Sequence, residues 1–122
     1  MSWVQNERPR YAWLTNAGEL VLFEELHSEV RHALGMQGID IDPWPLAAAM
    51  RAIHRVAEEL LDGSGPSPRA LDALPTPEQL CDLVDHELRR ERTLLTRAVI
   101  RSILAAYLAQ LRRLDIARVH YF

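Results

Sequence analysis

The stretch from Leu94 to Leu111, LLTRAVIRSILAAYLAQL, is apolar on almost every side when it is wound as a helix. Arg97 and Arg101 are its only strong interruptions. A helix of this kind is normally covered by several neighbours. The amphipathic helices of one small chain do not easily supply that cover, so the sequence predicts a homodimer formed through this helix. The expected dimer interface consists of Leu95, Val99, Ile103, Leu104, Tyr107 and Leu111.

Two further helices have clear starts in the sequence. Asp42 and Thr76 are typical N-cap residues, and each is followed by a proline, the residue favoured at the first helical position. Apolar residues then recur at helical spacing in both segments. The sequence therefore predicts helices over residues 43–62 and 77–90.

The apolar stripe changes phase after the second of these helices. Leu80, Val84 and Leu88 share one face, whereas Ile100 and Leu104 fall on nearly the opposite one at about 100° per residue. The change falls across residues 89–93, so we expect either a break there or a change of packing environment. The last helix is predicted over residues 93–114.

The N-terminal segment is ambiguous. Residues 11–23 fit a hairpin that turns at Asn16-Ala17-Gly18, and they also fit the start of a helix over residues 17–34. A lone hairpin is marginally stable in water, and no other segment offers a strand for it to join, so the helix is preferred. The predicted fold is then all-α: one domain over residues 1–122, a small bundle of about four helices, with an irregular arm (1–16) and a Gly/Pro/Ser-rich linker (63–75).

The charge of the chain is unevenly distributed. Residues 1–88 contain six arginines and fifteen acidic residues, a net charge of −9, whereas residues 89–122 contain eight arginines and two acidic residues, a net charge of +6. Such asymmetry says more about partners than about fold. The residues expected to bind a partner or nucleic acid are Arg89, Arg90, Arg92, Arg97, Arg101, Trp3 and Trp13.

Nucleic-acid binding by a transcriptional regulator is one alternative for the arginines, because phosphates require such charge. A helix-turn-helix fits poorly, since the turn would fall in DHELRRE, which lacks glycine and favours a helix. The other alternative is that Arg97 and Arg101 pair with acidic residues of 24–29 or 58–62.

The histidines suggest a metal-dependent enzyme in a helical bundle as a third alternative. His27, His54 and His86 are the candidate ligands, with Glu58 one helical turn after His54. Histidines on helix surfaces and in capping positions explain the same pattern. The sequence therefore predicts no catalytic residue, no metal site and no cofactor.

A single cysteine, Cys81, excludes an intrachain disulfide and fits a reducing compartment, so we expect a cytoplasmic protein. The N-terminus lacks the apolar core of a signal peptide, and no stretch of eighteen residues is free of charge, which argues against a membrane span. The expected function is that of a small non-catalytic interaction or regulatory protein that acts as a homo-oligomer.

Overall fold

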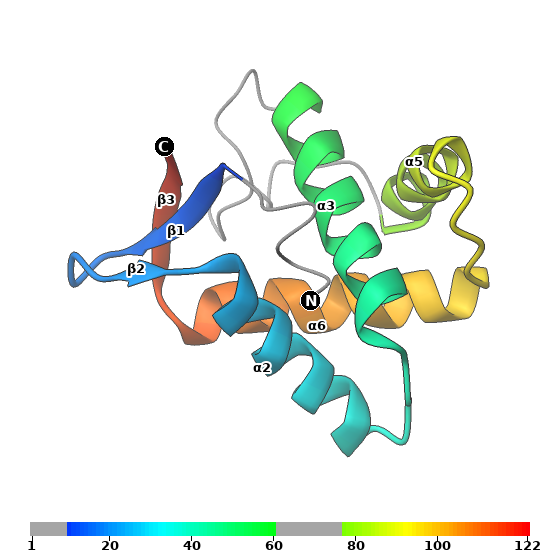
Figure 1. Cartoon of the computed structure of the whole chain (residues 1–122), viewed down its shortest axis with the longest axis horizontal. Coiled ribbons are helices and arrows are strands. Elements are labelled where there is room, and N and C mark those ends of the chain that lie inside the picture. Colours follow the sequence, from blue (N-terminus) through cyan, green and yellow to red (C-terminus); the bar gives the residue numbers. More distant parts are fainter. Residues whose placement is uncertain (1–9, 61–76) are drawn as a thin grey trace.

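The computed structural model describes residues 10–60 and 77–122, and within them it is mostly helical with a small sheet at one end (Figure 1). The elements, in chain order, are β1 (Tyr11–Thr15), β2 (Leu20–Val21), α2 (Phe23–Met36), α3 (Pro43–Leu60), α5 (Pro77–Arg90), α6 (Arg97–Arg113) and β3 (Ile116–Tyr121). The predicted linker (63–75), like most of the predicted arm, lies outside the described residues.

The helix starts that rest on proline are confirmed. Helices α3 and α5 begin at Pro43 and Pro77, and α5 ends at Arg90, where it was predicted to end. Of the two alternatives for residues 89–93, the structure shows the break, and α6 begins at Arg97, four residues later than the predicted residue 93. The first helix begins later than predicted, at Phe23 instead of residue 17.

The break between α5 and α6 is made by a left-handed residue. Arg92 has a φ of 59°, a conformation that closes helix C-termini and usually favours glycine. The backbone N–H of Thr93 donates to the Leu88 carbonyl at 2.9 Å, and that of Arg92 donates to the Arg89 carbonyl at 3.0 Å. These two bonds form a Schellman motif, so the chain leaves the helix without a glycine.

The all-α prediction is wrong in one respect, because the chain also forms a three-stranded antiparallel sheet in the order β2-β1-β3. The register places Trp13 opposite Val21 on one side and opposite Val119 on the other. The hairpin at residues 11–23 was rejected for want of a third strand. That strand comes from the end of the chain, beyond the last helix.

The tip of the hairpin is fixed by its turn and by the start of β3. Gly18 has a φ of 86°, and its N–H donates to the Thr15 carbonyl at 3.0 Å. Asn16 connects this turn to the residue that precedes β3, because its Nδ2 donates a hydrogen bond to Asp115 Oδ1 at 2.8 Å. A short turn with glycine in this conformation suits a hairpin.

Helix α6 is covered by its own chain, which contradicts the reason for expecting a dimer through it. Elements α2, α3, α5 and β3 all pack against it. Its largest side chains are buried without a second copy: Ile103, Leu104, Tyr107 and Leu111. Leu95 and Val99 are partly buried against the same core. Much of the exposed side of α6 consists of Ala98, Ala105 and Ala109, whose small side chains need little cover.

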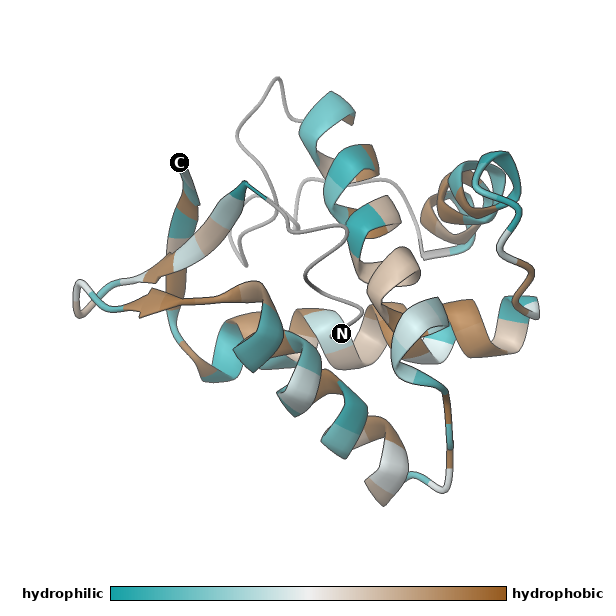
Figure 2. Ribbon diagram, in the orientation of Figure 1, coloured by the Kyte–Doolittle hydropathy of each residue, from teal (hydrophilic) through white to brown (hydrophobic). Residues whose placement is uncertain are grey.

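The hydropathy of the ribbon follows this arrangement, with apolar residues on the inner sides of the helices (Figure 2). Among the described helices, none combines the length and the apolar character needed to cross a membrane.

Candidate functional site: the arginine–carboxylate network between α5 and α6

Helix α5 presents a row of acidic side chains to solvent because its other side is buried. Leu80, Val84 and Leu88 point into the core. At helical spacing, the opposite side then carries Glu78, Asp82 and Asp85, which are three or four residues apart.

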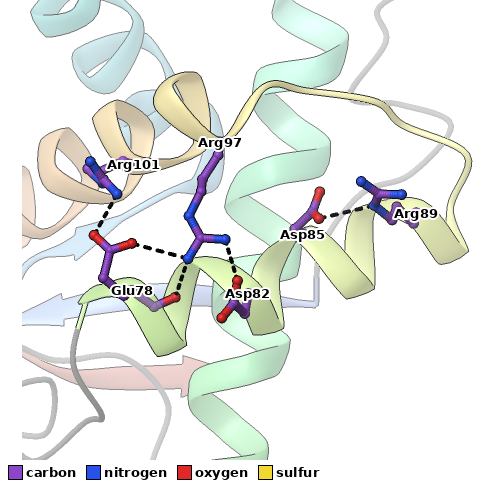
Figure 3. A network of polar contacts seen from close by, with 6 residues as sticks. All are labelled: Glu78, Asp82, Asp85, Arg89, Arg97 and Arg101. Carbon is purple, nitrogen blue, oxygen red and sulfur yellow. Dashed lines mark hydrogen bonds and ion pairs between the residues drawn. The ribbon is translucent and has the colours of Figure 1, made fainter.

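Helix α6 brings two arginines to this row. Thr96 caps the helix, and its Oγ1 accepts a hydrogen bond from the Val99 N–H at 3.3 Å. Arg97 and Arg101 then lie one turn apart at the exposed start of α6, and both reach across to α5 (Figure 3). By setting the first residue of α6, this cap determines that the side chains of Arg97 and Arg101 lie on the side of the helix that faces α5.

Glu78 is shared by both arginines. Its Oε2 lies 3.1 Å from Arg97 Nη2, and its Oε1 lies 2.5 Å from Arg101 Nη2. Arg97 also donates to the Glu78 carbonyl at 3.1 Å and to the carboxylate of Asp82. One residue of α5 thus binds two residues of α6, which ties the two helices together across the break.

The ion pairs of this network shift the pKa values of its members so that the charged forms are favoured. Hydrogen bonds from Arg97 lower the pKa of Glu78, and the hydrogen bond to Asp82 raises the pKa of Arg97. Both groups are exposed, so solvent screening keeps the contribution to stability small.

The remaining predicted arginines lie on the same part of the surface. Arg89 pairs with Asp85 at 3.0 Å within α5, and Arg90 pairs with Glu87 at 3.2 Å. Arg92 is exposed and forms no ion pair with the described residues. Its role in the structure is the backbone conformation that ends α5.

The electrostatic consequence is that the arginine-rich stretch has no excess charge. Residues 77–101 contain five arginines and five acidic residues, a net charge of zero. Pairing with acids was one of the alternatives for Arg97 and Arg101. The segments proposed as partners, 24–29 and 58–62, are wrong, because Glu78 and Asp82 of the neighbouring helix take that role.

A double-mutant cycle tests this pairing. We expect Arg97→Ala and Glu78→Ala to show a small favourable coupling at low salt that disappears at high salt, because exposed ion pairs are weak and screened. Urea unfolding of the two single variants and the double variant measures it. Arg92→Ala is the matched control and should show no coupling to Glu78→Ala. Coupling that persists at high salt would contradict an exposed, screened pair.

Of the two tryptophans predicted to bind a partner, Trp13 is in the core and Trp3 lies outside the described residues. The Trp13 side chain is 0% exposed and packs between the rings of Tyr11, Phe23 and Tyr107. The partner-binding prediction for Trp13 is therefore wrong. The prediction placed it in an irregular arm, whereas it sits on the central strand of the sheet, facing the helices.

The three candidate histidines have three different environments. His27 Nε2 lies 3.0 Å from the Pro43 carbonyl, and His86 is exposed on α5. His54 is buried in α3 and contacts aromatic residues of the sheet. Within the described residues, no group of three or more histidine, cysteine or acidic side chains is placed to hold a metal ion.

His54 is the centre of a cluster of polar side chains, only some of which could be predicted from the sequence. Its ring stacks on Tyr11 with 3.7 Å between centroids. His54 Nε2 lies 3.1 Å from Glu58 Oε2 and 3.4 Å from the Tyr121 hydroxyl. The His54–Glu58 pair follows from their spacing of four. The tyrosines come from opposite ends of the chain, so no local signal pointed to them.

Burial governs the protonation of this cluster. It lowers the pKa of His54 to about 4, although Glu58 acts in the opposite direction. It also raises the pKa of Tyr121 to about 12. The imidazole is therefore neutral at pH 7, and its Nδ1 is buried with no hydrogen-bond partner among the described residues. The tyrosines are far from ionisation, so the cluster works as a packed polar contact between α3 and the sheet.

A hollow of about 540 Å³ lies at the end of α2 and contains none of the residues predicted from the sequence. Arg31, His32, Ile39 and Asp40 are among the residues that line it. Arg31 is already used there, since its Nε donates to the Ile41 carbonyl at 3.2 Å.

Searches of protein-family models, of curated proteins and of solved structures found no match to this chain. Function is therefore inferred from the geometry of the chain itself.

Proposed function

We propose that this chain is a small, non-catalytic cytoplasmic protein that acts by binding another polypeptide, as an interaction or regulatory protein. Its binding surface is the open side of the sheet. We use this term for the sheet face turned away from the helices together with the free edge of β3, comprising Leu14, Leu20, Leu22, Arg118, His120 and Phe122.

The two faces of the sheet can be told apart from the strand register. Trp13 and Val119 lie opposite each other and are both buried, so they face the helices. Successive side chains of a strand alternate between faces. Leu14 and Arg118, which are also register partners, therefore point the other way. Figure 1 shows the sheet at one end of the molecule, with the helices gathered on one side of it.

The exposed apolar side chains on this side carry the proposal. Phe122 is 70% exposed, Leu20 is 44% exposed and Leu22 is 43% exposed. Single exposed apolar residues are common, but several on one side of a sheet mark an interaction surface. Leu20 lies opposite Leu14 in the register, and Phe122 packs edge-on against His120 at 5.2 Å. Leu20 and Leu22 thus lie at one edge of the sheet and Phe122 at the other, on the same side of it as Leu14.

The alternative functions receive less support from the geometry. Four of the five arginines predicted to bind nucleic acid, all except Arg92, pair with carboxylates of α5, so phosphate would have to displace these ion pairs. A homodimer through α6 would need side chains that are already buried within the chain. If a second copy is the partner, it binds at the open side of the sheet.

Site-specific photo-cross-linking in the native host tests the proposal. A benzoylphenylalanine at position 122 is expected to form discrete cross-linked species with another chain. The matched control is the same residue in place of Met36, which is 78% exposed at the far end of α2. Equal cross-linking from both positions, or none from position 122, would remove the open side of the sheet as the binding surface.

A further inference from the structure

The free edge of β3 has backbone groups available for another strand. The Phe122 N–H donates to the Arg10 carbonyl at 2.9 Å, on the side of β1. In an antiparallel ladder the bonding direction alternates along the strand. The backbone groups of Val119 and Tyr121 therefore point away from β1, and the described residues provide β3 with no second neighbouring strand.

This edge has few of the features that usually block strand addition. Strand β3, IARVHY, is six residues long and contains no proline and no lysine, and its one charged residue, Arg118, points away from the helices. Sheet edges in monomeric proteins are commonly protected by proline, lysine and inward-pointing charges. Its bulge lies at the beginning of the strand, opposite Leu14 and Thr15, and leaves residues 118–121 in regular register.

The charge of the sheet selects among extended partners. The described strands contain no acidic residue. Arg118 and His120 point to the face away from the helices, and Arg10 lies across from Phe122 at its end. An incoming strand would therefore meet positive charge on this face, and apolar residues such as Val119 on the other.

We propose that the partner is an extended polypeptide segment in which acidic residues alternate with apolar ones, and that it adds to β3 as a fourth strand. This inference rests on the proposed function and specifies the partner of the same surface. Backbone hydrogen bonds to β3 provide the affinity, and the alternating side chains provide the specificity.

Two other occupants fit less well. A second copy of β3 would bring a second Arg118 to the same edge, which adds like charge and no acidic partner. Single-stranded nucleic acid would find Phe122 as a stacking surface, but Leu20 and Leu22, the other exposed apolar residues of this side, lie at the opposite edge of the sheet and offer no second aromatic face.

Fluorescence anisotropy with labelled model peptides tests the inference on the full chain. A peptide of four Glu-Val repeats is expected to bind saturably, and one of four Lys-Val repeats at least about tenfold more weakly. Arg118→Glu should weaken the Glu-Val peptide by about threefold to tenfold. Arg92→Glu makes the same change of net charge on the α5–α6 loop and should leave binding unchanged.

N-methylated peptides test the strand geometry separately. Methyl groups on the valine amides of the Glu-Val peptide block one edge of it, and methyl groups on the glutamate amides block the other. We expect one of these peptides to lose affinity by about tenfold or more and the other to bind almost normally, because only one edge faces β3. Equal behaviour of the two peptides would overturn strand addition.

The remaining outcomes separate this inference from the proposed function. Tighter binding of a thymidine oligonucleotide than of the Glu-Val peptide would assign the surface to nucleic acid. No saturable binding of the Glu-Val peptide at millimolar concentration would overturn the acidic strand. In that case, cross-links from position 122 would still support polypeptide binding, and a cross-linked species of twice the chain mass would identify a second copy as the partner.

Discussion

Replacing Trp13 by alanine is expected to lower the free energy of unfolding by about 3–5 kcal/mol, the usual cost of removing a large buried aromatic side chain. The Trp13 ring is fully buried and contacts aromatic residues from three elements, including Phe23 of α2 and Tyr107 of α6. Its loss would leave a cavity where the sheet meets the helices. Urea unfolding followed by circular dichroism measures the change.

The control for this variant is Trp44→Ala. Trp44 is 42% exposed at the start of α3, where the Arg51 guanidinium lies 5.8 Å from its ring centroid. We expect a loss of about 1 kcal/mol or less. Wild-type stability of the Trp13 variant would show that the ring is not part of the core, and would restore it as a candidate for partner binding.

Acidification is expected to remove about 3 kcal/mol of stability through His54 alone. The pKa of His54 is lowered to about 4 in the folded chain, so the unfolded state binds this proton first. The contribution is therefore complete above pH 6.5, declines as the pH falls toward 4, and does not decrease further below that. Chemical unfolding at a series of pH values measures the slope.

The groups around His54 determine how this slope is interpreted. Burial is the main cause of the lowered pKa, Glu58 opposes it, and Arg55 adds to it. Tyr11 and Tyr121 face the ring from the sheet and stay neutral over this range. Carboxylates elsewhere also titrate, so the informative quantity is the difference between the wild type and a variant.

His54→Phe provides that comparison, because phenylalanine can still stack on Tyr11 but cannot take up a proton. The variant should be less stable at pH 7 and should lose less stability on acidification than the wild type. His86→Phe, at an exposed position of α5, should keep the wild-type slope. Parallel pH profiles for the wild type and His54→Phe would contradict a buried neutral imidazole.

Much of the helical part of the fold was predictable from the sequence, since its signals are local. A proline after a capping residue marked the first residues of α3 and α5, and the change of phase marked the break before α6. The exposed alanines show where such reasoning fails. When Ala98, Ala105 and Ala109 are counted as apolar, α6 has more apolar surface than one small chain is expected to cover. The methyl group of alanine, however, exposes little apolar area.

For the arginine–carboxylate network between α5 and α6, the sequence predicted the arginines that take part but not the acidic residues with which they pair. The arginines of the α5–α6 region were found from the sequence, but their partners were not, because the packing of α5 on α6 decides that Glu78 and Asp82 lie within reach. The open side of the sheet was not predictable, although the hairpin of β1 and β2 had a local signal. Leu14 and Arg118 are about a hundred residues apart in the sequence and become neighbours only through the register of β1 and β3.

The sequence by itself determined the approximate limits of the helices within residues 10–60 and 77–122, the place after Arg90 where the apolar face changes, and the pairing of His54 with Glu58. These features depend on interactions within a few turns of one helix. The tertiary structure alone decided that Trp13 is core, that α6 is covered by its own chain and that the hairpin has a third strand. Each of these depends on contacts between distant segments, whose free energy appears only after the helices have packed and brought both ends of the chain together.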